Sequence, residues 1–232
     1  MALPFDLSFA FAPYRLSGTV YGVLMNHRAA LAVLGDAAHQ PPYKAPPKAP
    51  VLYVKPRNTL VPAGAPLRID DPAGELEVGA ALGIVIGRTA CAVAEADALG
   101  HVAGFIVVCD CTLPRAGHFR PQIRAMARDG SCVLGRAVAS RSEVGDPDAL
   151  AIRVFVDGAL AQSSSTSEHV RSTARLIADV SDFMTLMPGD VLLTGSAPEG
   201  PRVRPGACIA IEIDRVGRLE TRAVSGAERP SA

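Results

Sequence analysis

Tryptophan is absent from the 232-residue chain, and no apolar run approaches the roughly 20 residues that a membrane-spanning helix needs. The amino-terminal residues lack the basic segment that opens a secretory signal peptide. Lysine plus arginine and aspartate plus glutamate both number 23, so no excess of positive charge would attract nucleic acid. We therefore expect a cytoplasmic protein with neither a membrane nor a nucleic-acid partner.

Cysteine is scarce, and the five residues include no C-x-x-C pair. Cys109 and Cys111 form a C-x-C, and on a strand both thiols would share one face. A zinc half-site and a pair of buried, reduced thiols both fit this spacing. The second is the more typical outcome when no further pair is present.

The chain is rich in turn-forming residues, with 19 prolines and 21 glycines. These counts predict many short strands joined by turns, and the length suffices for one domain with a sizeable core. We expect a mainly β fold with some α, in which residues 1–17 form an amino-terminal arm and residues 18–232 form the domain.

Short apolar, β-branched stretches bounded by glycine predict two central strands, at residues 82–86 and 103–109. Asp157-Gly158 is a hairpin signal. Further strands are predicted at residues 19–24, 51–55, 150–156, 160–162, 190–194, 207–213 and 219–224. Helices are predicted at residues 28–34 with Asn26 as N-cap, at 93–99, and from Ser165 or Ser167 to Phe183.

Asp110 directly follows the second central strand. A carboxylate at the end of a buried strand would lie in a dry environment. Burial of this charge requires a cation, a cluster of hydrogen-bond donors or a proton. Asp110 is therefore the first candidate for a functional residue, either as a metal ligand or as a base.

The order and spacing of several segments resemble the fumarylacetoacetate hydrolase superfamily over roughly residues 18–224. The matching segments are Lys55-Pro56, residues 83–88, 103–110, 128–135 and 186–195, and Gln162 with Thr166. Residues 25–28, 42–48 and 55–59 narrow the resemblance to the branch that decarboxylates and isomerises ring-fission products in 4-hydroxyphenylacetate catabolism. The resemblance implies a fumarylacetoacetate-hydrolase-like mixed β-sandwich or roll with short helices, usually assembled as dimers.

The resemblance also implies a Mg²⁺ or Mn²⁺ site for a small dicarboxylate 2-oxo acid. Its ligands would be two glutamates at alternate positions of one strand and an aspartate on the neighbouring strand. Alternate residues of a strand point the same way, and hard divalent cations prefer oxygen ligands. Such a metal would stabilise the enolate that forms when a C–C bond breaks or a proton moves.

This chain departs from that pattern at the ligands. Gly79 and Ala81 stand at the two glutamate positions, and only Asp110 is retained. Glu75 and Glu77 have the same spacing but lie four residues upstream, about 13 Å along an extended strand at roughly 3.3 Å per residue. We therefore expect a degenerate metal site that does not bind Mg²⁺ or Mn²⁺.

Two further departures concern proton transfer and anion binding. The His–Glu pair that the family often carries on its first short helix is replaced by Ala30 and Val33, and a family lysine is replaced by Met126. His27 stands near the lost histidine, and a surface or capping role is the more typical one for it. None of the three replacing side chains can act as a base or hold a carboxylate.

Other residues could still bind an anionic substrate. Arg120, Arg124 and Arg128 could hold a dicarboxylate through bidentate pairs, or Arg128 could instead neutralise Asp110 or Asp129. The family resemblance adds substrate contacts from Gln162, Thr194 and Gly195, although a purely structural turn at 194–196 fits equally well.

Three functional hypotheses remain open. The chain could be a non-catalytic subunit of the decarboxylase/isomerase, either a homodimer or a heteromer with a catalytic homologue. It could be an active enzyme with a changed mechanism: a metal-independent isomerase with Asp110 as base and the arginine cluster as anion clamp, or a variant in which Glu75, Glu77 and Asp110 recruit a metal. It could also be a dicarboxylate-binding module without turnover.

Overall fold

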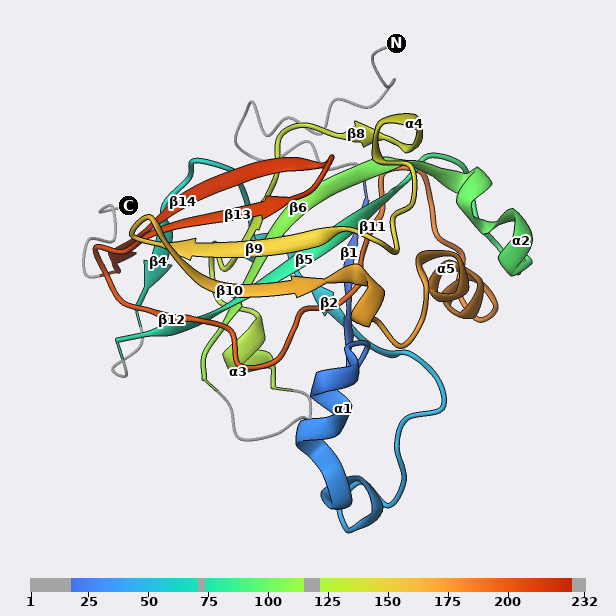
Figure 1. The fold of residues 1–232 in the computed structure, drawn as a ribbon, viewed down its shortest axis with the longest axis horizontal. Helices are drawn as coiled ribbons and strands as arrows, with labels where there is room; N and C mark the ends of the chain where they lie inside the picture. The colour runs from blue at the N-terminus through green and yellow to red at the C-terminus, as the bar shows by residue number, and fades with distance from the viewer. Residues whose placement is uncertain (1–17, 71–73, 115–121, 227–232) are drawn as a thin grey trace.

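The computed structural model describes residues 18–70, 74–114 and 122–226. They form two β-sheets with short helices at the margins (Figure 1). The larger sheet has the order β2-β1-β11-β5-β6-β7-β3, with β12 beside β5 and β8 beside β6, and the smaller has the order β10-β9-β13-β14-β4. This architecture confirms the predicted fold class.

The larger sheet contains β1 Val20–Leu24, β2 Val51–Lys55, β3 Leu60–Pro62, β5 Leu76–Ile86, β6 Val102–Thr112, β7 Cys132–Leu134, β8 Ala139–Ser140, β11 Val191–Leu193 and β12 Arg202–Val203. The smaller contains β4 Leu67–Ile69, β9 Ala151–Val156, β10 Ala159–Ser165, β13 Cys208–Ile213 and β14 Gly217–Ser225. The α-helices are α1 Arg28–Leu34, α2 Glu95–Ala98, α3 Ile123–Met126, α4 Arg141–Val144 and α5 Thr173–Ser181. The 3-10 helices are η1 Gly35–His39, η2 Arg57–Thr59, η3 Leu99–His101 and η4 Thr166–Glu168.

The antiparallel pair β5–β6 is the centre of the molecule. It runs in register from Glu77 opposite Thr112 to Ile86 opposite Val102. One face of β5, which includes Leu82 and Ile84, packs in the main core against the smaller sheet. The other face enters a second, smaller core cluster. Because side chains alternate along a strand, this second face is also the one that carries position 79.

Both central strands are longer than the predicted ranges 82–86 and 103–109. β5 begins at Leu76 and β6 continues to Thr112. Asp110 therefore lies inside β6, not beyond its end. Glu77 and Gly79 in the β5 extension, and Asp110 and Thr112 in the β6 extension, interrupt the apolar pattern, so hydrophobicity alone did not reveal these ends of the strands.

Two helix predictions need correction. The helix from Ser165 or Ser167 to Phe183 is wrong at its start: Ser165 caps only the short η4, and α5 begins at Thr173 with Ser172 as its N-cap. The N-cap of α1 is His27 and not Asn26. The Nδ1 atom of His27 accepts a hydrogen bond from the Ala29 backbone N–H. Serine, asparagine and histidine side chains can all accept hydrogen bonds, so residue type alone did not select the correct N-cap.

The expected hairpin is confirmed. Asp157 and Gly158 both have positive φ, 51° and 83°, and they connect β9 to β10. Positive φ at both central residues is the geometry that suits the right-handed twist of the flanking strands.

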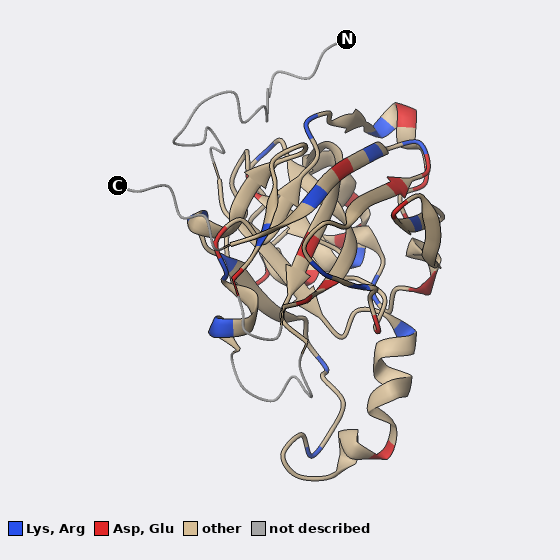
Figure 2. Ribbon diagram, turned by 90° about the vertical axis from the view of Figure 1, so that its left-hand side faces the viewer, with Lys and Arg blue, Asp and Glu red and all other residues tan. Residues whose placement is uncertain are grey.

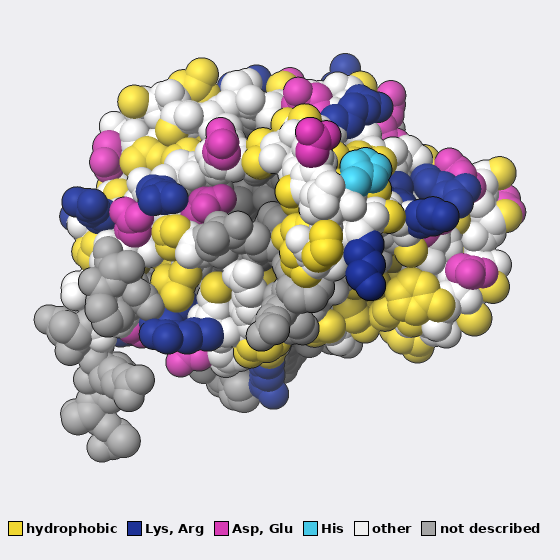
Figure 3. All heavy atoms as spheres, turned by 90° about the horizontal axis from the view of Figure 1, so that it is seen from below, with side chains coloured by type: hydrophobic (Ala, Val, Ile, Leu, Met, Phe, Trp, Pro, Cys, Tyr) yellow, Lys and Arg dark blue, Asp and Glu magenta, His cyan; other side chains and the backbone are white. Residues whose placement is uncertain are grey.

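Helix α1 projects from the body together with the segment that follows it (Figure 1). None of its residues is buried, and Figure 2 shows the helix almost without charge between its ends. Figure 3 looks at the molecule from the side on which α1 projects, and on this face Lys and Arg side chains are interspersed with Asp and Glu.

Some sequence predictions lie outside the described residues. The arm at residues 1–17 and Arg120 are among them. In the part of the chain that the structure describes, no helix is long and apolar enough to cross a membrane.

The packing of β5 predicts a large effect for Leu82→Ala. Leu82 is fully buried, so truncation should lower the free energy of unfolding by about 2–5 kcal/mol, as measured by urea denaturation. Leu160→Ala is the matched control, because Leu160 is 57% exposed on β10 and should change stability by less than about 0.5 kcal/mol. Equal losses in the two variants would contradict the assignment of β5 to the core.

Candidate functional site

Asp110 lies opposite Gly79 in the β5–β6 ladder and is 7% exposed. Both carboxylate oxygens have a partner. Lys55 Nζ lies 2.7 Å from Oδ1, and the Tyr53 hydroxyl donates a hydrogen bond to Oδ2. The requirement that a buried carboxylate have a cation and donors is therefore met from β2, the strand at the edge of the larger sheet.

Lys55 is the most deeply buried charged residue of the site, at 1% exposed. Besides Asp110, its ammonium donates to the Met126 carbonyl at 2.5 Å and lies 3.4 Å from Ser131 Oγ. The ammonium, which carries three N–H donors, therefore makes two hydrogen bonds and an ion pair with Asp110. Burial alone would lower the pKa of Lys55, but the charge and hydrogen bonding of Asp110, together with Cys132 and Cys111 nearby, raise it overall. Lys55 is therefore charged at neutral pH.

Tyr53 owes its position to a glycine. Gly22 on β1 is the register partner of Tyr53, and a Cβ at Gly22 would lie 2.0 Å from the phenol ring. The ring thus lies directly across the Gly22 backbone, which points its hydroxyl at Asp110. A side chain at position 22 would displace the phenol.

A cavity of about 720 Å³ opens beside Asp110. Its apolar wall comes from β1 and the α1 region and includes Val23, Leu24, Ala30, Val33 and Leu34. Its polar lining includes Tyr43, Tyr53, Glu77, Asp110, Ser196 and Arg202. The positions of the lost His–Glu pair therefore do face this cavity, but as apolar side chains.

The two lost glutamate positions have no space or polarity for a ligand. A Cβ at Gly79 would lie 2.6 Å from the Asp110 carbonyl oxygen. Ala81 is buried in the smaller core cluster with Val108 and Cys132. The strand therefore presents backbone and methyl groups where the family resemblance implies carboxylates.

The upstream glutamates do not replace them. Glu75 is turned away into ion pairs with Arg202 at 3.1 Å and Arg204 at 3.7 Å. Glu77 does line the cavity with Asp110. Among the residues that the structure describes, no group of three or more His, Cys, Asp or Glu is placed to hold a metal ion.

The predicted arginine clamp is not assembled at the cavity. Arg124 is exposed on α3, and neither it nor Arg128 lines the cavity in the described part of the chain. The alternative that Arg128 neutralises Asp110 is wrong, since Lys55 occupies that role. Asp129 receives a hydrogen bond from Asn58 Nδ2 at 2.6 Å.

The remaining predicted contacts support the backbone. Gln162 donates to the carbonyl oxygens of Pro198 and Glu199, and thereby holds a loop that lines the cavity. Thr194 is buried and donates to the Leu82 carbonyl at 3.3 Å. Gly195 has a φ of 97°, which favours glycine. For Thr194 and Gly195 the structure thus favours the structural turn.

The C-x-C is a pair of free, fully buried thiols. Cys109 Sγ and Cys111 Sγ lie 3.4 Å apart on β6. The hydrogen bond between them, together with burial, raises the pKa of Cys109 well above its usual value. This arrangement agrees with the expected reduced pair.

Two histidines are buried at the base of α1. The rings of His27 and His169 meet edge to face with centroids 6.1 Å apart, and His27 Nε2 lies 3.4 Å from Glu168 Oε2. Burial, assisted by His27, lowers the pKa of His169 to about 4. His169 is therefore neutral at physiological pH, and sequence reasoning missed it because no motif contains it.

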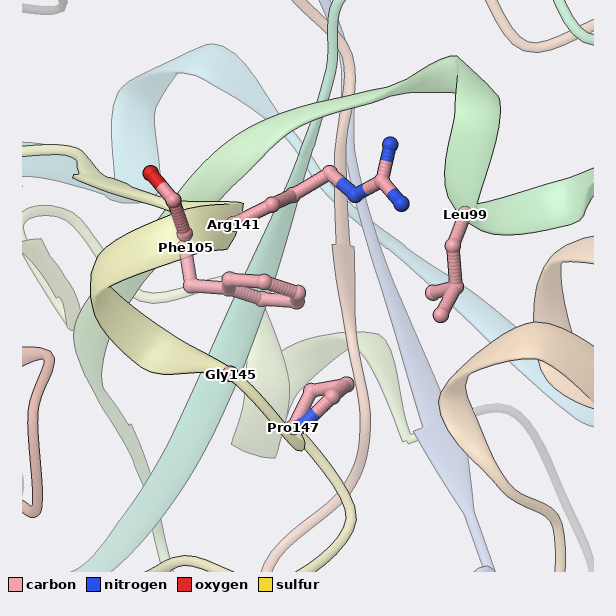
Figure 4. A pocket seen from close by; sticks show the side chains of 6 residues that line it. Leu99, Phe105, Arg141, Gly145 and Pro147 are labelled. Carbon is pink, nitrogen blue, oxygen red and sulfur yellow. The ribbon is translucent and has the colours of Figure 1, made fainter.

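A separate cavity of about 320 Å³ lies between α4 and the start of β6 (Figure 4). Arg141 is the one charged side chain among its six lining residues, with Leu99 and Phe105 on other sides. None of the predicted site residues lies there, so the Asp110 cavity is the candidate site.

Comparison with known proteins agrees with this fold. Residues 19–224 match the model of the fumarylacetoacetate (FAA) hydrolase C-terminal family.

The chain belongs to the fumarylacetoacetate hydrolase family.

It is 36% identical over 214 residues to the 4-hydroxyphenylacetate degradation bifunctional isomerase/decarboxylase of Escherichia coli, covering 92% of this chain and 48% of that protein. The chain thus spans about half the length of this curated relative. A 5-carboxymethyl-2-hydroxymuconate delta-isomerase structure from Mycobacterium smegmatis superposes with a TM-score of 0.75 and 26% identity, covering 91% of this chain and 80% of that one.

A fumarylpyruvate hydrolase from Pseudomonas aeruginosa, solved with Mn²⁺ and pyruvate, also has a TM-score of 0.75, with 27% identity over 89% of each chain. A divalent metal is therefore typical of fumarylacetoacetate hydrolase family structures. The residues of this chain do not fit that group, because Gly79 and Ala81 offer no ligand oxygen and both oxygens of Asp110 are engaged.

The sequence analysis included Lys55 in a matching motif without a role for its side chain. Tyr53 was not among the candidate site residues. The available signal was a lysine that ends the otherwise uncharged strand of residues 51–55. A charge next to an apolar strand is usually solvated, so only the tertiary structure reveals its buried partner.

The pKa of His169 predicts a pH dependence of stability. Its folded pKa of about 4 lies below the ordinary value of 6.5, so between these pH values the unfolded chain binds more protons. The stability that His169 contributes is complete above pH 6.5 and is lost as pH falls toward 4, by about 3 kcal/mol in total.

Denaturation at pH 7 and pH 4.5 measures this loss. His169→Phe should reduce the difference between the two pH values, whereas the exposed control His39→Phe should not. An unchanged pH difference in His169→Phe would show that His169 does not titrate as its burial implies.

Proposed function

We propose that this chain is a non-catalytic fumarylacetoacetate-hydrolase-family subunit of a decarboxylase/isomerase that acts on dicarboxylate 2-oxo acids in 4-hydroxyphenylacetate catabolism. The observation that carries the proposal is that Gly79, opposite Asp110, and Ala81 offer no ligand oxygen at the place where the family resemblance implies a metal centre. The single retained carboxylate, Asp110, is paired with Lys55. The catalytic work then belongs to a homologue that keeps the metal ligands, in a heteromer with this chain.

The lining of the large cavity supports this proposal. Decarboxylation or isomerisation of a 2-oxo acid needs a group that stabilises an enolate and a group that moves a proton. Ala30 and Val33 supply neither. Among the described lining residues Arg202 is the one cation, and it is paired with Glu75.

The alternative of a metal-independent isomerase has less support. As a base, Asp110 would have to give up its contacts with Lys55 and Tyr53, and the arginines expected to clamp the substrate, Arg124 and Arg128, do not line the cavity. A dicarboxylate-binding module also has less support, since the Glu77 carboxylate lines the cavity and would repel a dianion.

The test is turnover of the ring-fission dicarboxylate by the purified chain in Mg²⁺ or Mn²⁺. We expect no turnover by this chain alone. When it is mixed with a homologue that keeps both glutamates, we expect a complex whose activity is unchanged by Asp110→Asn in this chain. The corresponding aspartate substitution in the homologue is the control and should abolish activity.

Asn keeps the shape of Asp110, and circular dichroism would verify that the variant is folded. Turnover by this chain alone that Asp110→Asn removes would contradict the proposal and favour an independent enzyme. Failure of the two chains to associate would contradict the subunit role.

A further inference from the structure

The imidazole of His27 caps the start of α1, and this cap depends on the protonation state of one ring nitrogen. The Nδ1 atom accepts a hydrogen bond from the Ala29 backbone N–H at 3.2 Å. A neutral histidine with an accepting Nδ1 carries its proton on Nε2, whereas a protonated histidine donates from both nitrogens. Protonation of His27 would therefore set one N–H against another and remove the cap.

A second contact of His27 favours its protonated form. Its Nε2 atom lies 3.4 Å from Oε2 of Glu168, which belongs to the 3-10 helix η4. The His27 side chain is 5% exposed, so the attraction between the two groups is screened less than it would be between surface charges. The same imidazole thus has one contact that requires the neutral form and one that favours the charged form.

The other charged and titratable groups around His27 do not favour its protonation. Arg28 follows it in α1 and is a cation, whose guanidinium donates to a backbone carbonyl of η4 at 2.7 Å. His169 meets His27 edge to face, and burial, together with the charge of His27, lowers the pKa of His169 to about 4. Among the described residues, Glu168 is therefore the carboxylate that forms an ion pair with a protonated His27.

Helix α1 is sensitive to the loss of its cap. It is seven residues long, has no acidic residue in its first turn, and none of its residues is buried. A helix this short is marginal in water unless a buried face stabilises it. Loss of one N-cap shifts the equilibrium of a helix by about fivefold, which is a large effect for an element with so few other contacts.

The order of α1 also determines one wall of the candidate cavity. Ala30, Val33 and Leu34 line the space beside Asp110, and in Figure 1 the first turn of α1 is the end that meets the body. Loosening of that turn would expose this apolar wall of the cavity to solvent. The protonation of His27 is thereby coupled to the shape of the cavity.

We propose that His27 and Glu168 form a pH-sensitive switch on this wall: neutral His27 holds the start of α1, and protonated His27 pairs with Glu168 and releases it. The inference goes beyond the proposed subunit function, because it concerns the order of one helix within this chain. Its readout is the mobility of α1, so its failure is distinguishable from failure of the proposed function, which is read by turnover and complex formation.

The lack of tryptophan in the chain allows a specific probe of α1. Val33 is 66% exposed on the helix, and Val33→Trp would add a tryptophan to a chain that has none. Its fluorescence anisotropy would be measured from pH 8 to pH 5, the interval in which histidines change charge, while circular dichroism verifies that the protein stays folded. The anisotropy should fall as the pH is lowered, because α1 loosens.

Three variants of this protein identify the groups responsible. His27→Asn keeps an accepting cap that cannot be protonated, so its anisotropy should be the same at pH 8 and pH 5. At pH 5 its α1 amides should exchange hydrogen about fivefold more slowly than those of the parent. His39→Asn is the matched control, since His39 is exposed in η1 and should leave the pH response unchanged.

Glu168→Gln tests the second half of the switch. Glutamine can replace glutamate in the capping box with Ser165 but carries no charge. Without the carboxylate the protonated form of His27 is less favoured, so the midpoint of the anisotropy change should move to lower pH. This variant keeps the inference testable if His27→Asn does not fold.

A response that disappears in His27→Asn, persists in His39→Asn and moves to lower pH in Glu168→Gln supports the switch. An anisotropy that does not change between pH 8 and pH 5 in the folded parent would overturn it. A response that persists in His27→Asn would also overturn it, because another group would then loosen α1. An unchanged midpoint in Glu168→Gln would contradict the role of that carboxylate.

Discussion

The buried ion pair between Lys55 and Asp110 is the interaction on which the candidate site depends. It links β2 at the edge of the larger sheet to β6 at its centre, although β1, β11 and β5 lie between them in the strand order. Removal of two charges from water is unfavourable, and the attraction between them offsets this only when the remaining donors and acceptors are satisfied. Met126, Ser131 and Tyr53 provide those contacts.

Glycines on the neighbouring strands leave space for the side chains around this pair. Gly22 makes room for the Tyr53 ring, and Gly79 brings the β5 backbone so close to Asp110 that a Cβ would contact its carbonyl oxygen. Each glycine removes a side chain where another group must approach. The consequence is a cavity lining that is apolar along α1 and includes a carboxylate paired with Lys55.

Sequence patterns were sufficient for the parts of the fold in which local preference and tertiary packing agree. The apolar runs of β5 and β6 and the Asp157-Gly158 turn were identified because their residues specify the same structure at every level. The start of α5 was misplaced because several serines could cap a helix and only packing selects Ser172. For Asp110, burial could be predicted, and so could the need for a cation or donors.

The identity of that cation could not be predicted. Lys55 and Asp110 are 55 residues apart in the chain, and their contact depends on the order and register of β2, β1, β11, β5 and β6. Arginines near Asp110 in sequence were the natural candidates, yet Arg124 is exposed on α3. His169 likewise becomes notable only because the fold buries it against His27. Charge pairing across strands is therefore the information that a single sequence does not contain.

A double-mutant cycle measures the central claim directly. Unfolding free energies would be determined by urea denaturation at pH 7 for the wild type, Lys55→Met, Asp110→Asn and the double variant. Each single substitution should cost about 3–5 kcal/mol, since it leaves one partner buried without its counterpart. The double variant should cost less than the sum by about 2 kcal/mol or more. Additivity of the two losses within about 0.5 kcal/mol would show that the charges do not interact, and would contradict this account of the site.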